Sequence, residues 1–339
     1  MRYPEFLKQG DTIGLVAPSF GVCGYPYQDR YESARRAFLE KGYKLKECAS
    51  VHNLEHARSN SAKVRAREFM DMYLDEEVDF IMSVAGGELM LEILPYIDFE
   101  KLRKSKPKYF MGLSDNTCLT FTLPLLTDTA AIYGPNFGSF GMEKWDRSTK
   151  ESYEIMTGKR HKQKSFPKYE SDNSAEVELN PLCGYKLTEK VVYESLDGQD
   201  CQMQGRLIGG CLDIIVSMIG TPYCDWKPFM EKYRSDGIIW FLEACDLNVL
   251  DISRALWSMR NAGLFEGCTG IFMGRAKNPE PLFDVDVREA IEANVGDLNI
   301  PVIFDGDIGH VAPIWTLISG SMATIRKEGK KGSIELELK

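Results

Sequence analysis

The sequence lacks several features that mark whole classes of protein. It has no Cys-x-x-Cys pair among its nine cysteines, no glycine-rich dinucleotide fingerprint and no Walker-type phosphate loop. No apolar run reaches the roughly 18 residues of a membrane span, and the first residues, 1–6, contain no apolar segment typical of a secretory signal. We therefore expect reduced cysteines, a cytoplasmic location, no membrane and no nucleotide cofactor.

Positive charge is also scarce, because 41 lysines and arginines face 50 aspartates and glutamates and leave a net charge of −9. A phosphate backbone is bound by a basic surface, so this balance argues against nucleic acid as a partner. The basic run 159–164 is short, and such runs are usually solvated surface.

Histidine is rare, with only four in the chain. His52 and His56 are one helical turn apart, but their order does not match the His-Glu-x-x-His pattern of zinc peptidases. His161 lies in the basic run. The sequence therefore predicts no metal site, which leaves His310 as the histidine to explain.

What the chain does contain is an alternation of strand and helix patterns. Apolar strand-like runs at 12–17, 80–85 and 107–112 are separated by segments with helical spacing, which indicates an α/β fold with a doubly wound, mostly parallel sheet. The 339 residues exceed one ordinary core. We expect a Rossmann-like domain over 1–158, a polar linker over 159–180, and a strand-rich α/β domain over 181–339.

One serine lies where chemistry is expected in such a sheet. The stretch 107–117 reads as a strand, a tight turn at Ser114 and the start of a helix over 118–126. A hydroxyl there would project from the carboxyl end of a strand, near the amino end of a helix, where backbone N–H groups stabilise an oxyanion. The spacing Gly-x-Ser-x-Asn meets the nucleophile-elbow pattern only in part, and a simple helix cap is the alternative.

A serine nucleophile needs a base, and the base needs a carboxylate. His310 follows an apolar strand and lies in a glycine-rich loop, where backbone can approach a site closely. Glu243 ends the apolar run 238–242, where an unpaired carboxylate would be costly. Asp246, Asp305 and Asp307 are rival acids, and spacing along the chain does not choose among them. The backbone N–H groups of Asp115 and of Gly86 or Gly87 are candidate oxyanion donors.

Several of these stretches occur together in one order. The segments 10–19, 86–87, 112–117, 133–135, 205–210, 242–243 and 309–310 are similar to those of the LD-carboxypeptidase and microcin-immunity family of serine peptidases. The similarity extends along nearly the whole chain.

This resemblance implies a Ser-His-Glu triad with Ser114 as nucleophile, Glu243 as acid and His310 as base. It also implies that the second domain is the smaller one and barrel-like, that the site forms between the domains, and that the protein is a homodimer without metal or organic cofactor. The substrate would be a small peptide or a peptidyl nucleotide, cleaved at an amide near its carboxyl end.

Two departures bear on the substrate. Residues 84–88 replace the Arg-Gly-Gly-Tyr-Gly that is usual in the murein-recycling members, and Cys211 stands where many relatives have asparagine. The pattern at 82–87 is closer to the microcin-immunity branch. A non-catalytic protein that binds a small ligand remains the alternative function, and an acyltransferase or esterase with the same triad is a third.

Overall fold

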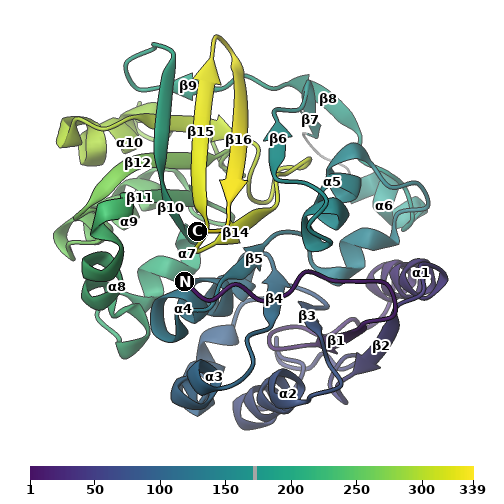
Figure 1. The fold of residues 1–339 in the computed structure, drawn as a ribbon. Coiled ribbons are helices and arrows are strands. Elements are labelled where there is room, and N and C mark those ends of the chain that lie inside the picture. Colours follow the sequence, from purple (N-terminus) through teal and green to yellow (C-terminus); the bar gives the residue numbers. More distant parts are fainter. Residues whose placement is uncertain (171–173) are drawn as a thin grey trace. The chain divides into compact units, whose positions relative to one another are not determined.

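The structure is a computed structural model, and it describes residues 1–170 and 174–339. The chain forms two compact units, each with its own sheet (Figure 1). The first unit comprises Met1–Arg160 and Asp172–Lys186, and the second comprises His161–Ser171 and Leu187–Lys339. The chain therefore passes between the units more than once.

The first unit is built on a parallel sheet. Its strands have the order β2-β1-β3-β4-β5, and each pair along it is parallel. This is a doubly wound order in which the direction of winding reverses between β1 and β3, and ligands bind such sheets at the carboxyl ends of the strands near that point. The strands are β1 (Thr12–Val16), β2 (Lys44–Glu47), β3 (Phe80–Ser83), β4 (Tyr109–Gly112) and β5 (Ala131–Tyr133).

Helices connect these strands, as the alternation in the sequence predicts. All residues of β3 and β4 are buried, which explains their continuous apolar runs. The segment Met90–Tyr96 between β3 and β4 is a 3-10 helix that contains Pro95. The helices are α1 (Tyr27–Glu40), α2 (Ala62–Leu74), η1 (Met90–Tyr96), α3 (Phe99–Lys104), η2 (Ser114–Asn116), α4 (Thr117–Thr127), η3 (Phe137–Gly141), α5 (Arg147–Met156) and α6 (Ser174–Leu179).

The second unit has a mixed sheet with the order β6-β16-β15-β10-β11-β12-β13-β9. Its middle strands, from β10 to β13, are parallel, and the outer ones are antiparallel. Two further strands, β7 and β8, form a separate two-stranded sheet, and β14 is not part of the eight-stranded order. The strands of the unit are β6 (Lys162–Lys164), β7 (Lys168–Glu170), β8 (Leu187–Lys190), β9 (Glu194–Ser195), β10 (Cys201–Cys211), β11 (Ile238–Glu243), β12 (Cys268–Gly274), β13 (Val302–Gly306), β14 (Leu317–Ser319), β15 (Met322–Glu328) and β16 (Lys331–Glu337).

The sheet of the second unit is open, which corrects the barrel-like expectation. Within the described residues β6 and β9 are its two edges, and they pair with β16 and β13 rather than with each other. The α/β class itself is confirmed. The helices are α7 (Leu212–Met218), η4 (Pro222–Cys224), α8 (Trp226–Tyr233), η5 (Arg234–Asp236), α9 (Val249–Asn261), α10 (Val287–Val295) and η6 (Gly296–Leu298).

The polar stretch 159–180, which the sequence predicts as a linker, contains β6, β7 and α6. Its residues 161–170 belong to the second unit and pair there with β16 and β8, whereas α6 belongs to the first unit. Residues 171–173 of the expected linker lie outside the described part of the chain.

Candidate active site

Ser114 lies at the bend between β4 and η2, at the carboxyl end of a buried strand. Its backbone has a φ of +69°, a left-handed conformation that is rare for a residue with a side chain. Leu113, just before it, is extended. A strained serine between a strand and a helix is the geometry of a nucleophile elbow, and such strain is typical of functional positions.

Two asparagines hold this bend through hydrogen bonds. The Asn136 Oδ1 accepts hydrogen bonds from the Leu113 N–H at 2.9 Å and from the Asn116 Nδ2 at 3.1 Å. Asn116 Nδ2 in turn donates to the Ala85 carbonyl at 2.9 Å. The bend is thereby tied to the loop that follows β3, so the strained conformation of Ser114 is held from both sides.

That loop approaches Ser114 closely because it contains glycine. A Cβ on Gly86 would lie 3.0 Å from the Ser114 Cβ and 3.3 Å from its Oγ. Gly87 has a φ of +148°, and a Cβ there would overlap the side chains of Ser19 and Phe20. Glycine at position 86 therefore lets the loop backbone approach the Ser114 side chain, and glycine at position 87 fits it against Ser19 and Phe20.

The Asp115 carboxylate is hydrogen bonded to groups other than a histidine. It is fully buried and accepts hydrogen bonds from the Ser19 hydroxyl and from the Met90 N–H, the latter at 2.8 Å. Burial raises the pKa of Asp115, and these two hydrogen bonds offset the shift only in part. The carboxylate thus joins the nucleophile bend to segments that follow β1 and β3, a role that sequence reasoning missed.

In the second unit His310 pairs with Glu243. The His310 Nδ1 lies 2.9 Å from the Glu243 Oε2, the glutamate side chain is fully buried, and the histidine side chain is 16% exposed. Glu243 is the last residue of β11, and His310 lies in the loop after β13. An ionised carboxylate only accepts hydrogen bonds, so in the neutral imidazole Nδ1 carries the proton and Nε2 is the nitrogen that can act as a base.

A glycine again allows the close approach. Gly309 has a φ of +100°, and a Cβ there would lie 2.6 Å from the Glu243 Oε2. The glycine-rich loop that precedes His310 in the sequence is therefore packed against the carboxylate.

The protonated form of His310 is strongly favoured. Burial alone lowers its pKa, but the attraction of the Glu243 carboxylate and hydrogen bonds to Cys245 and Glu243 outweigh burial, so the pKa stands well above the ordinary value. The pair is suited to hold an imidazolium, as a general base must after it accepts a proton.

The rival acids have other positions. The Asp307 Oδ1 is 2.6 Å from the Arg275 Nη2, and its Oδ2 accepts from the Tyr193 hydroxyl at 3.0 Å. Asp246 lies in the turn after β11, where its backbone N–H donates to the Asp213 carboxylate at 2.8 Å. Among the described residues, the acid hydrogen bonded to His310 is Glu243.

The other three histidines have other surroundings. His52 Nε2 lies 3.5 Å from Glu47, and the His56 side chain is 87% exposed beside Glu55. His161 is exposed. In the described ranges 1–170 and 174–339, no group of three or more His, Cys, Asp or Glu side chains could hold a metal ion. Within the same ranges, no helix has the length and apolarity that crossing a membrane requires.

Ser114 thus belongs to the first unit, and Glu243 and His310 belong to the second. The fold that holds them defines a class: an α/β protein in which a doubly wound parallel sheet precedes a mixed sheet. Comparison with known proteins assigns the chain within that class.

The chain belongs to the LD-carboxypeptidase family. Residues 13–134 match the N-terminal domain of that family, and residues 204–325 match its C-terminal domain. The expected resemblance is confirmed, and family membership classes the chain with the carboxypeptidases.

Individual relatives come from both branches of the family. The chain is 25% identical to a "Probable murein peptide carboxypeptidase" of Bacillus subtilis, over 98% of this chain and 94% of that protein. It is 26% identical to the microcin C7 self-immunity protein of Escherichia coli, over 97% and 94% of the two chains. A solved structure of the microcin C7 self-immunity protein in complex with aspartyl sulfamoyl adenosine has a TM-score of 0.84 at 23% identity and covers both chains fully, which shows a shared fold.

Proposed function

We propose that this protein is a serine carboxypeptidase or amidase that uses a Ser114–His310–Glu243 triad. The observation that carries the proposal is the 2.9 Å contact between the His310 Nδ1 and the buried Glu243 carboxylate. A histidine with a fixed tautomer is the base that a serine in a strained strand-to-helix bend requires. The first domain would supply the nucleophile, and the second would supply the acid and the base.

The reaction follows from the properties of these groups. The Ser114 Oγ attacks the carbonyl carbon of the scissile amide while the His310 Nε2 takes the serine proton, and Glu243 stabilises the imidazolium. The N–H of Asp115, in the first turn of η2, and an N–H of Gly86 or Gly87 hold the negative oxygen. The imidazolium then protonates the leaving amine, and a water molecule activated by His310 releases the acyl group.

The substrate class is a small peptide or a peptidyl or aminoacyl nucleotide. Support comes from relatives named for murein peptides and for microcin immunity, and from solved relatives that bind aspartyl sulfamoyl adenosine and glutamyl sulfamoyl guanosine. Of the two, we favour the microcin-like conjugate, because residues 84–88 lack the arginine and tyrosine of the murein branch. Release of D-alanine from a murein tetrapeptide, measured beside hydrolysis of an aspartyl nucleotide conjugate, separates the two.

Labelling with a fluorophosphonate tests the nucleophile directly. The wild-type chain should bind one equivalent, and the peptide that carries the label should contain Ser114. Ser114→Ala should lose both the label and about 10⁴-fold or more in turnover. The matched control is Ser33→Ala on α1, outside the candidate site, which should keep both.

Other outcomes point to the alternatives. A wild-type chain that takes no label, yet is stabilised by aspartyl sulfamoyl adenosine, would be a non-catalytic binding protein. Labelling together with transfer of the acyl group to an added amine in preference to water would indicate an acyltransferase, and a preference for ester substrates would indicate an esterase.

The homodimer and the cytoplasmic location remain predictions from the family resemblance and the sequence. Light scattering coupled to size-exclusion chromatography decides the first, because a dimer would have twice the 38.4 kDa mass of the chain.

A further inference from the structure

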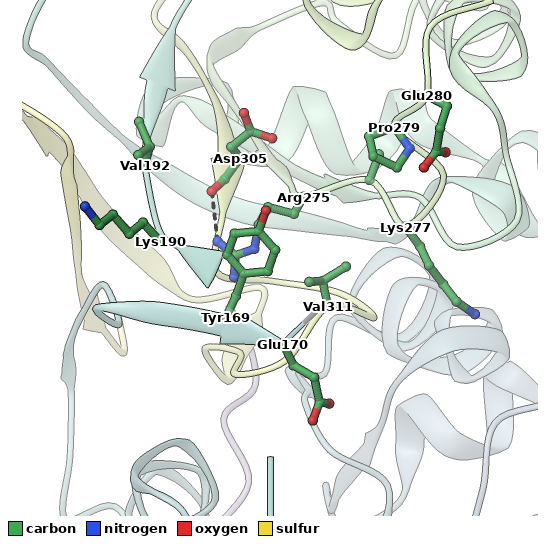
Figure 2. A pocket seen from close by; sticks show the side chains of 11 residues that line it. Tyr169, Glu170, Lys190, Val192, Arg275, Lys277, Pro279, Glu280, Asp305 and Val311 are labelled. Carbon is green, nitrogen blue, oxygen red and sulfur yellow. Dashed lines mark hydrogen bonds between the residues drawn. The ribbon is translucent and has the colours of Figure 1, made fainter. Parts of the chain in front are cut away.

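The second unit contains a cavity of about 340 Å³ next to the His310–Glu243 pair. Figure 2 shows side chains around it from β7, β8, β13 and the loop after β12. Val311, the residue after His310, lines it. Lys277 lines it as well, and its N–H donates to the carbonyl of Ala244, the residue after Glu243, at 3.2 Å. The cavity lining thus adjoins His310 along the chain and is joined by a backbone hydrogen bond to the residue after Glu243.

Arg275 lines this cavity, and its positive charge is paired with the Asp307 carboxylate. Its Nη2 lies 2.6 Å from Asp307, its Nη1 donates to the Asp305 carbonyl at 3.0 Å, and the guanidinium lies over the Tyr169 ring at 4.8 Å (Figure 2). The two Nη atoms are thus held, the charge of the guanidinium is balanced by Asp307, and the buried Nε has no hydrogen-bond partner among the described residues.

The Asp305 carboxylate lines the cavity without a hydrogen bond from the described part of the surrounding fold. The hydrogen bond from Arg275 is accepted by the backbone carbonyl of Asp305. Within residues 1–170 and 174–339, the Asp305 carboxylate has no hydrogen bond or ion pair. The residue also has a φ of +58°, a left-handed conformation. A half-buried carboxylate without a hydrogen bond, on a left-handed backbone, lowers stability, and such features persist where a ligand uses them.

The surroundings of Asp305 favour a cationic ligand group. Burial raises its pKa to about 6, with Glu194 adding to the shift and Arg275 opposing it, so the carboxylate is charged at neutral pH. Glu170 and Glu280 also line the cavity, against Lys190 and Lys277. With the Arg275–Asp307 pair set aside, the cavity wall has three carboxylates and two ammonium groups.

We propose that this cavity binds a primary ammonium group of the substrate, with the Asp305 carboxylate as its acceptor. The ligand would be an amino acid or peptide portion with a free amine, either an α-amine or the amine of a lysine-like side chain. Lys190 and Lys277 would face a carboxylate of the same ligand. This inference rests on the proposed function for the position of the scissile amide, but the binding it describes can be measured without turnover.

The test uses the full-length Ser114→Ala chain and two pairs of probes. One pair is the tetrapeptide L-Ala-γ-D-Glu-L-Lys-D-Ala and its Nε-acetyl derivative, and the other is aspartyl sulfamoyl adenosine and its N-acetyl derivative. By calorimetric titration, at least one free amine should bind about 10- to 100-fold more tightly than its acetylated partner, the factor expected for one charge-assisted hydrogen bond. Equal affinity within both pairs overturns the proposal.

The variant Asp305→Asn assigns the effect to the carboxylate. Asparagine has the same shape and tolerates a left-handed backbone, so the chain should fold and should lose the preference for the free amine. Asp284→Asn is the matched control, because Asp284 is also an aspartate with positive φ (63°) but is exposed and outside the cavity lining. A preference that survives in Asp305→Asn contradicts the proposal.

Stability separates a binding role from a structural one. Asp305→Asn should be at least as stable to heat at pH 8 as its parent, since it removes a half-buried charge that makes no hydrogen bond within the described chain. Loss of amine preference together with a lower melting temperature would make Asp305 structural and overturn the proposal. Full hydrolysis by Ser114→Ala would instead refute the triad and leave the amine test intact.

Discussion

At the scale of single residues, the chemistry of the proposed triad depends on how Glu243 acts on His310. The carboxylate raises the pKa of the imidazole well above its usual value. Raising that pKa favours proton uptake during attack, but it also means that the free enzyme must lose a proton before His310 can act as a base. The acid limb of kcat/KM should therefore lie above the ordinary histidine range.

Glu243→Gln tests this coupling. The amide keeps the shape but removes the charge, so the pKa of His310 should fall and the acid limb of the pH–rate profile should move to lower pH. The rate at the optimum should drop by about 10²- to 10⁴-fold, because the tautomer is no longer fixed. The measurement is kcat/KM from pH 5 to 10, and an unmoved acid limb would separate Glu243 from the titration of His310.

The same pair should contribute to stability in a defined pH window. A histidine whose pKa is raised by folding stabilises the native state fully below its unfolded pKa, about 6.5, and this contribution is lost as pH rises through the folded pKa. Urea unfolding of the wild-type chain should show this loss on the alkaline side, and Glu243→Gln should reduce it.

Asp305 should also make the free energy of unfolding fall with rising pH, but in a lower pH range. Its folded pKa, about 6, exceeds the value of about 3.9 for an unfolded aspartate. Between these values the native state binds more protons than the unfolded state, so the stability should fall as pH rises from about 4 to 6. Asp305→Asn should remove this part of the slope, whereas Asp284→Asn should keep it.

At the scale of elements, the turn after β4 and the loop after β3 form one unit of structure. Gly86→Ala would bring a methyl group within 3.0 Å of the Ser114 Cβ and 3.3 Å of its Oγ. We expect a loss of turnover of about 10-fold or more, because a 1 Å displacement of a reacting group can reduce the rate 100-fold, with little change in melting temperature.

Gly138→Ala is the control for that variant. Gly138 lies on η3, where a new Cβ would meet only the Val84 carbonyl at 3.7 Å, an ordinary contact. Its turnover should be unchanged. Equal losses in the two variants would mean that added methyl groups in this unit disturb folding in general.

The sequence predicts most of these elements because their patterns are local. The apolar runs at 12–17, 80–85, 107–112 and 238–242 form β1, β3, β4 and β11, where the residues indicate strands. Helix starts are harder to predict: Asn248 and Asp251 could each cap a helix, and in the structure Asn248 does so, accepting from the Leu250 and Asp251 N–H groups at the start of α9. Both residues are good caps, so composition alone favours neither.

Contacts between distant residues are what the sequence does not predict. The choice of Glu243 over Asp307 depends on Arg275, which takes Asp307, and the two are 32 positions apart. The contacts of Asp115 with Ser19 and Met90 are of the same kind. The short strands β6 and β7 have no periodicity of their own and form by pairing with β16 and β8, so the stretch that contains them looks like a linker.

At the scale of the whole molecule, neither unit is one continuous segment. Within the first unit, Arg30 Nη2 donates to the Cys183 carbonyl at 2.9 Å, and the Glu143 N–H donates to the Leu182 carbonyl at 2.9 Å. These partners come from the part of the chain that returns after β6 and β7.

A fragment of residues 1–160 should therefore be less stable than the complete first unit. Joining residues 174–186 to its end through a flexible linker should raise its melting temperature by several degrees, and Arg30→Ala should cancel part of the gain. The measurement is calorimetric melting of the three fragments. Identical melting would show that the returning segment adds nothing to this unit.

The division of the proposed triad between the two units has a consequence for the living cell. During synthesis, Ser114 emerges from the ribosome long before residue 310 has been translated, and the early product holds an alcohol with nothing to activate it. A copy truncated before residue 310 would lack the proposed base for the same reason. Hydrolysis would begin only when translation is complete, which protects neighbouring peptides from an unfinished enzyme.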